Sequence, residues 1–263
     1  MSDLDRNYAS PFGRAASRAD AATVDAGLRS YMLKIYNYMA IGLAITGLAA
    51  LGVYMAAVTP DQSAAAGRIG SQYLTAFGVA MFVSPLKWVF ILAPLVMVFA
   101  ISFGINRLRP ATAQMLFWVF AALMGVSLSS IFLVYTHSSI VRVFFITAAS
   151  FGALSLYGYT TKRDMTGMGS FLMMGLFGII IASLVNIFIA SSMLQFVVSV
   201  VGVLIFAGLT AWDTQRLKND YIYGYAAQGG EVAEKAAITG ALSLYLNFIN
   251  LFTLLLQLLG QRD

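Results

Sequence analysis

Six polar residues share one face of the last apolar segment of the sequence. At about 100° of rotation per residue, they fall within roughly one third of the circumference of a helix. This polar stripe consists of Thr239, Ser243, Asn247, Asn250, Thr253 and Gln257. Hydrocarbon does not satisfy hydroxyl and amide groups, so the stripe must face protein or water. Two interpretations stay open: a network of interhelical hydrogen bonds, or the wall of a hydrated pathway.

One acid stands out because of its position at the end of an apolar segment. Asp213, in GLTAWDTQRLK, closes the sixth such segment. The helix dipole disfavours a carboxylate at a helix C-terminus, so Asp213 needs a neighbouring cation or takes up protons as part of its function. The alternative is a solvated acid beyond the membrane edge. Asn186, in SLVNIF inside the fifth apolar segment, is expected to be a further partner of the polar stripe.

The composition argues against several classes of function. The sequence has no cysteine and a single histidine, His137, which argues against a thiol nucleophile, a disulfide framework or a histidine-rich metal centre. A complete nucleophile elbow, an HExxH motif and a phosphate-binding glycine loop are all missing. The net charge of +5 comes from basic residues scattered over short loops, which does not resemble a nucleic-acid-binding surface. We therefore expect no enzyme activity, no cofactor, no metal site and no nucleic-acid partner.

The elements that carry these residues are predicted to be membrane-spanning helices. Hydrophobic residues make up 60% of the chain and charged residues 10%, against about 25% charged in soluble domains. Seven apolar segments have roughly the 17–25 residues that a span requires. They are Ile35–Val58, Trp88–Gly104, Ala111–Tyr135, Val141–Tyr159, Phe171–Ala190, Met193–Trp212 and Ala236–Gly260. The sequence thus predicts an all-α membrane protein embedded in a lipid bilayer.

Outside these spans, two segments need separate interpretations. Residues 1–34 are expected to form a polar cytoplasmic tail, with a possible helix from Ala21 to Lys34, and residues 35–260 the seven-helix transmembrane domain. The apolar stretch Tyr73–Val83 is expected to be a half-helix on or in the membrane, because a full span there would break the alternation of charge.

Basic residues set the expected orientation. Of the 16 Lys and Arg residues, twelve fall on the side of the N-terminus and four on the opposite side. Because cytoplasmic loops carry the excess of Lys and Arg, the N-terminus is predicted to be cytoplasmic and the C-terminus to lie across the membrane. Compact loops without organelle signals favour a bacterial inner membrane.

Several segments together resemble the Bax inhibitor-1 (YccA-like) family of membrane proteins. The resemblance is carried by GYTTKRDMTGMG with FLMMGLFGIIIASLVNIF, then by VLIFAGLTAWDTQRLK, and then by ALSLYLNFINLF. It extends over about residues 31–260 and is most specific in FAGLTAWDTQ. The resemblance implies six helices around a central seventh, the C-terminal one. It also implies either a pH-dependent calcium leak or a regulatory role towards other membrane proteins.

The resemblance also implies roles for individual residues. The family's leak depends on two acids that share a proton-sensitive contact; Asp213 matches the first, but the second falls on Asn247. Two carboxylates can share one proton, whereas an aspartate and an asparagine do not. The family also has a basic group near the first acid, for which Arg107 and Arg109 are the candidates.

Two functions therefore remain as hypotheses. The first is a pH-sensitive cation (calcium) leak, with Asp213 as the gating acid and Asn247, Asn250 and Asn186 along the ion pathway. The second is a regulator without transport activity that binds a membrane-embedded quality-control protease or another membrane protein. The polar stripe and Asp213 favour the leak, while the polar tail and the asparagine at position 247 favour the regulator.

Overall fold

The computed structural model describes residues 11–105, 107–225 and 230–262. In this part of the chain, seven helices are long and apolar enough to cross a membrane. They are α1 (Pro11–Ala57), α3 (Lys87–Gly104), α4 (Pro110–Leu128) extended by the short α5 (Ile131–Val134), α6 (His137–Thr160), α7 (Thr166–Ile189), α8 (Ser192–Tyr223) and α9 (Gly230–Leu259). The predicted all-α membrane fold with seven spans is confirmed.

Local sequence signals fix several helix ends. Thr136 and Ser191 precede α6 and α8 in extended conformation, and each hydroxyl accepts a hydrogen bond from a backbone N–H of the first turn. Pro110 occupies the first turn of α4, where its missing N–H costs nothing. Asp164 lies one residue before the cap of α7 and accepts hydrogen bonds from the hydroxyl and the N–H of Thr166. These bonds hold the pKa of the Asp164 carboxyl below its usual range, the hydroxyl bond being the larger cause.

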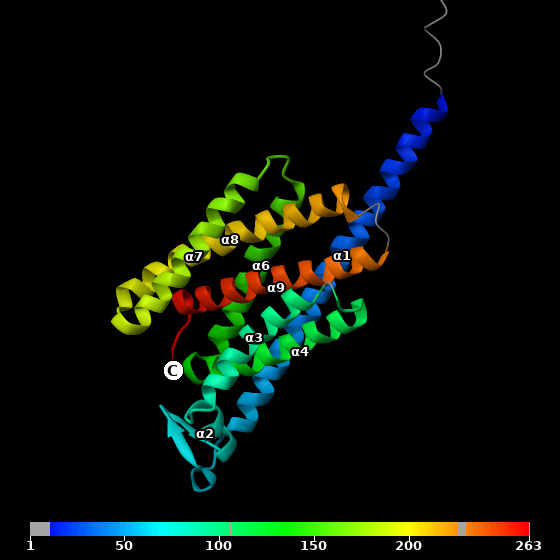
Figure 1. Ribbon diagram of the computed structural model, residues 1–263. Helices are drawn as coiled ribbons and strands as arrows, with labels where there is room; N and C mark the ends of the chain where they lie inside the picture. Colours follow the sequence, from blue (N-terminus) through cyan, green and yellow to red (C-terminus); the bar gives the residue numbers. More distant parts are fainter. Residues whose placement is uncertain (1–10, 106, 226–229, 263) are drawn as a thin grey trace, which may run out of the picture.

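Helix α9 has the largest buried share of the seven spans. Its main neighbours are α1, α4, α6 and α8, whereas α3 packs chiefly on α4 and α7 chiefly on α8. Figure 1 shows α9 in the middle of the bundle, with α7 and α8 on one side and α3 and α4 on the other. Four helices, α1, α4, α6 and α8, thus pack against α9, and α3 and α7 lie outside them.

The centre of the bundle is built around an aromatic side chain of α9. Tyr245 is fully buried, and its ring meets Phe117 and Phe120 of α4 edge to face at centroid distances of 5.7 and 5.6 Å. Its hydroxyl lies 2.6 Å from the hydroxyl of Thr46 on α1, so the polar end of the ring is satisfied. This cluster ties α1, α4 and α9 together.

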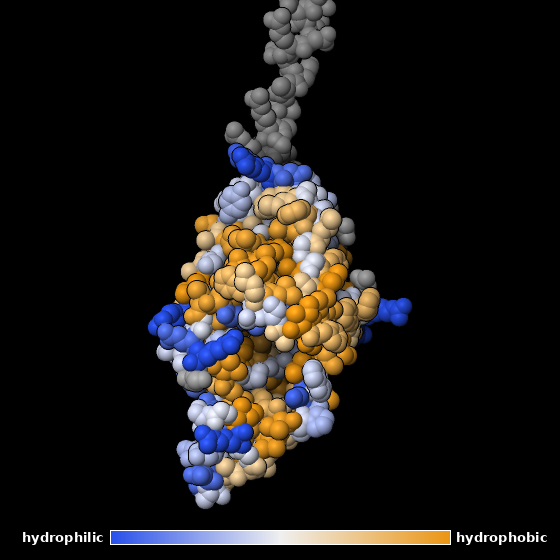
Figure 2. Space-filling model, turned by 90° about the vertical axis from the view of Figure 1, so that its left-hand side faces the viewer, coloured by the Kyte–Doolittle hydropathy of each residue, from blue (hydrophilic) through white to orange (hydrophobic). Residues whose placement is uncertain are grey.

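The outer surface is apolar, as a bilayer requires. Figure 2 shows broad areas of hydrophobic side chains with hydrophilic ones gathered in patches around them. Helix α7 is the most exposed span, and Phe188 near its end is 89% exposed. In water such a surface would aggregate, but in hydrocarbon it has no desolvation cost.

The segment between the first two spans differs from the prediction. It forms a small antiparallel sheet of β1 (Val58–Thr59), β2 (Gly67–Ile69) and β3 (Gln72–Leu74) in the order β1-β3-β2. The 3-10 turn η1 (Gln62–Ala64) connects β1 to β2. Tyr73–Val83 is therefore not one half-helix: Tyr73 and Leu74 belong to β3, and only Ala76–Phe82 forms a helix, α2. Three-residue strands carry too short an alternation to be distinguished from an apolar helical run in the sequence.

The expected boundary between tail and transmembrane domain falls inside a continuous helix. Helix α1 begins at Pro11, and Leu28, Tyr31 and Met32 are buried in the core of the bundle. The Tyr31 ring stacks on Tyr221 of α8 at 4.9 Å. The packed domain thus begins before residue 34, while residues 1–10 of the expected tail lie outside the described residues.

Candidate functional site

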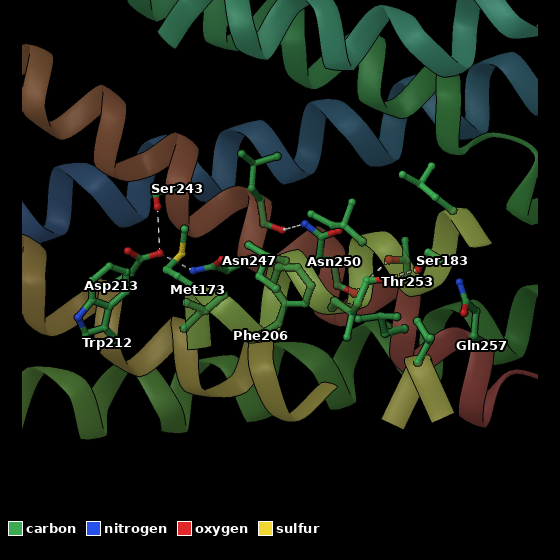
Figure 3. Close-up of a pocket in the computed structure, with 18 of the residues that line it drawn as sticks. Met173, Ser183, Phe206, Trp212, Asp213, Ser243, Asn247, Asn250, Thr253 and Gln257 are labelled. Carbon is green, nitrogen blue, oxygen red and sulfur yellow. Dashed lines mark hydrogen bonds between the residues drawn. The ribbon is translucent and has the colours of Figure 1, made fainter. Parts of the chain in front are cut away.

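Asp213 is buried between α8 and α9 and is held by two donors of the polar stripe. Its Oδ2 atom accepts a hydrogen bond of 2.7 Å from the amide nitrogen of Asn247 and one of 2.9 Å from the hydroxyl of Ser243. Asp213 is 4% exposed, so it is buried inside the protein and is not a solvated acid. Figure 3 shows both donors on α9 pointing towards Asp213. The pairing with Asn247, which the resemblance implied, is therefore present in the structure.

The basic partner of Asp213 is Arg216, not Arg107 or Arg109. The Arg216 guanidinium lies 2.7 Å from Oδ1 of Asp213, one turn further along the same helix. Among the described residues, Oδ1 has no hydrogen bond besides this ion pair. The guanidinium also stacks 4.7 Å from the centroid of Trp212. Arg107 and Arg109 lie between α3 and α4, and no ion pair joins either to Asp213.

The remaining members of the polar stripe are satisfied in two ways. Gln257 accepts a hydrogen bond of 2.8 Å from the Ser199 hydroxyl of α8, a second link between the two helices. Asn250 donates to the backbone oxygen of Leu246, and Thr253 to that of Asn250, which leaves their side chains along the helix surface. Thr239 likewise donates to the backbone oxygen of Lys235 on its own helix. The stripe thus makes interhelical hydrogen bonds through Ser243, Asn247 and Gln257 and forms a polar lining between Asn247 and Gln257.

A cavity of about 650 Å³ runs along this lining between α7, α8 and α9. Its wall on α9 begins at Ser243 and ends at Gln257, fourteen residues further on, which corresponds to about 21 Å of helix. That is most of the roughly 30 Å thickness of bilayer hydrocarbon. The wall on α7 is apolar apart from Ser183, and α8 contributes Asp213 and Arg216 at one end. Figure 3 shows the labelled polar side chains in a row, from Asp213 and Ser243 at one end to Gln257 at the other.

A second cavity lies on the other side of Arg216. It has a volume of about 610 Å³ and is lined by Arg216 together with Asp220, Lys235, Thr239 and Tyr225, among others. Arg216 is the one residue common to the linings of these two cavities. The Asp213–Arg216 pair therefore lies at the point where the two cavities meet.

Asn186 does not join the polar stripe, contrary to the prediction. Its side-chain oxygen accepts a hydrogen bond of 3.0 Å from the N–H of Ser191, in the turn between α7 and α8. The same turn holds Ala190 in a left-handed conformation, with φ of 52°. Asn186 therefore has a structural role in closing a helical hairpin, and it does not line the cavity.

The arrangement offers oxygen ligands to a passing cation but no clustered binding site. Within the described ranges, no group of three or more His, Cys, Asp or Glu side chains could hold a metal ion. A single carboxylate surrounded by amide and hydroxyl groups suits brief contact with a hard cation better than tight binding.

The sequence is similar to one protein family and to several known proteins. The family described as inhibitor of apoptosis-promoting Bax1 matches residues 28–263. The chain belongs to the Bax inhibitor-1 family. Its relatives include protein RP147 of Rickettsia prowazekii, with 48% identity over 91% of this chain and 93% of its own length. The inner membrane protein YbhL of Escherichia coli is 44% identical over 90% of this chain and 94% of its own length, and a protein of Caulobacter vibrioides is 45% identical over 99% and 98%.

Membership of the Bax inhibitor-1 family and the seven apolar helices make the chain an integral membrane protein. The sequence analysis missed Arg216 as the partner of Asp213. Its signal was present in WDTQR, because residues three apart on a helix are neighbours and a basic residue there can reach the acid.

Proposed function

We propose that this Bax inhibitor-1 family protein provides a slow leak pathway for cations, calcium among them, in a bacterial inner membrane. The observation that supports this most is the cavity of about 650 Å³ that follows the polar stripe from Gln257 to Asp213. Location in the inner membrane is proposed by likeness to the inner membrane protein YbhL.

The Asp213–Arg216 pair acts as the gate. A cation entering along α9 meets hydroxyl and amide groups first and then a carboxylate whose charge is already neutralised by Arg216 at 2.7 Å. The guanidinium both repels the cation and occupies the acceptor it needs. Leak requires Arg216 to move away, and its 41% exposed side chain, which borders the second cavity, has room to do so.

Asp220 is a second acceptor for Arg216. It lies four residues further along α8 and lines the second cavity. Because residues three or four apart share a helix face, Arg216 lies within reach of either acid. Transfer of the guanidinium from Asp213 to Asp220 would open the inner cavity and keep the cation paired, while Asn247 and Ser243 still donate hydrogen bonds to Asp213.

Asn247 changes how such a gate responds to pH. An asparagine has no titrating proton, so Asp213 has no second carboxylate with which to share one. Any pH response of the leak must then come from single carboxylates near the gate, because arginine keeps its charge at every accessible pH. We propose a shallower pH dependence than a paired-carboxylate site would give.

The test is calcium flux into dye-loaded vesicles that contain the purified protein, measured from pH 6 to 8. Arg216→Gln should raise the flux about tenfold or more, because removing one charge from a site next to a buried carboxylate changes the barrier to ion passage by roughly 1.4 kcal/mol or more. Asp213→Asn should lower the flux and remove its pH dependence. Asn247→Asp should steepen the pH dependence by restoring a carboxylate pair. Arg109→Gln serves as the matched control and should behave as the wild type.

A wild type without calcium flux across this range, together with an equally silent Arg216→Gln variant, would contradict the leak. Equal effects of Arg109→Gln and Arg216→Gln would contradict the assignment of the gate. In the first case the regulator hypothesis would take its place, and capture of a membrane-embedded protease by the intact protein would be the next measurement.

A further inference from the structure

A long apolar crevice separates α1 from α6 on a side of the bundle remote from the ion cavity. Both helices pack against α9, but few contacts join them to each other. The gap holds two cavities, of about 700 and 290 Å³, which share Leu43, Phe144 and Phe248 in their linings. They therefore form one continuous crevice whose floor is α9.

The larger cavity has the length of one bilayer leaflet. Along α1 it extends from Arg29 to Leu43, fourteen residues or about 21 Å. Half of the bilayer hydrocarbon is about 15 Å thick, so the remaining length reaches into the headgroup layer. Exposed side chains such as Leu33 and Leu156 border the cavity, so it is open to lipid.

Positive charge is confined to one end of the crevice. Arg29 is the charged residue in its lining, and within the described chain no ion pair joins it to a carboxylate. Tyr159 lines the same end, and the ammonium of Lys218 lies 5.6 Å from the centroid of its ring while donating to its backbone oxygen. Anionic headgroups attract basic residues at the membrane surface.

The lining favours a lipid chain as the occupant. Apart from Arg29, Ser155 and two tyrosines, the side chains that line the larger cavity are apolar. An acyl chain matches a crevice that is long, apolar and open to the bilayer.

We propose that this crevice binds one anionic phospholipid from the leaflet next to Arg29. Its phosphate lies at Arg29, and one acyl chain follows the crevice over Gly152 and Phe248 towards Leu43. The bound lipid fills the gap between α1 and α6 and so bridges these two helices. This site is separate from the cavity proposed for ions, and its existence does not depend on a leak.

Native mass spectrometry of the purified full chain, exchanged into equal amounts of phosphatidylglycerol and phosphatidylethanolamine, tests the proposal. The wild type should retain one molecule of phosphatidylglycerol in preference to phosphatidylethanolamine. Arg29→Gln should weaken that retention about fivefold, since one basic residue near an anionic surface contributes about 1 kcal/mol, and should leave phosphatidylethanolamine unchanged. Arg107→Gln, which removes an exposed cation outside the crevice, should have no effect.

Filling the crevice provides an independent test. A side chain added at Gly152 meets open space, so Gly152→Phe should occupy the crevice without displacing protein atoms and should abolish retention of both lipids. Gly178 of α7 also faces open space but lies outside the crevice, so Gly178→Phe is the matched control. Gly152→Leu replaces the larger variant if the latter does not fold. Equal retention by the Gly152 and Gly178 variants, or no preference for phosphatidylglycerol in the wild type, would overturn the proposal.

Discussion

At the scale of residues, the buried acid is stabilised by three neighbours of different chemistry. Asp213 has an amide donor in Asn247, a hydroxyl donor in Ser243 and a cation in Arg216. A buried carboxylate without such partners would cost several kcal/mol. Because Asn247 supplies a donor where a second carboxylate would need a shared proton, the site is satisfied without one.

A different residue carries backbone strain. Ala190 adopts φ of 52° in the turn between α7 and α8, a conformation that costs a residue with a Cβ atom roughly 1–2 kcal/mol. Ala190→Gly should therefore raise the free energy of unfolding by up to about 1 kcal/mol, measured by thermal unfolding in detergent. Ala182→Gly, in the middle of α7, should instead lower the free energy of unfolding, because there glycine only adds conformational freedom to the unfolded chain. Destabilisation by both substitutions would contradict this account of the turn.

At the scale of elements, close helix packing depends on particular glycines. Gly158 of α6 lies against the backbone of α8, where an added Cβ atom would collide with the carbonyl oxygen of Ala211. A backbone atom does not move aside as a side chain does, so the two helices would have to separate.

Gly158→Ala should consequently lower the stability of the bundle by about 1–3 kcal/mol, the usual range for overpacking. Gly152→Ala, on the same helix but facing open space, should change it by less than about 0.5 kcal/mol. The comparison needs only the midpoint of thermal unfolding for the two variants. Similar midpoints would show that α6 and α8 are not packed as closely as the structure has them.

At the scale of the whole molecule, α1 extends beyond the bundle and belongs to it only in part. Figure 1 shows its first turns projecting away from the other helices. The contacts that fix it begin with Leu28, Tyr31 and Met32, which are buried in the core.

Two truncations should separate these parts. A chain that starts at Thr23 should insert and unfold at nearly the wild-type temperature. A chain that starts at Leu33 loses three buried side chains, each worth about 1.5–3 kcal/mol, and should unfold at a much lower temperature. The same melting temperature for both chains would show that the first helix is not part of the folding unit.

Orientation in the membrane is a further property of the whole molecule. The excess of basic residues on the side of the N-terminus predicts that a reporter fused there is cytoplasmic, while one fused after Arg262 lies across the membrane. Protease protection of both reporters in right-side-out vesicles gives the answer. Two reporters on the same side would contradict either the seven spans or the charge argument.

Length, hydropathy and helical periodicity are local properties, and they were enough to predict the seven spans, the polar stripe on α9 and the need of Asp213 for a neighbouring cation. They did not reveal the start of α1, because a polar helix near the membrane surface has no hydropathy signal, nor the three short strands, whose alternation is too brief. The choice of Arg216 over Arg107 and Arg109, the position of Asn186 in a turn, the cavity beside α7 and the crevice between α1 and α6 were decided by the tertiary structure. Each depends on how far one helix lies from another and how it is rotated about its axis, and these quantities are set by the packing of side chains far apart in the sequence.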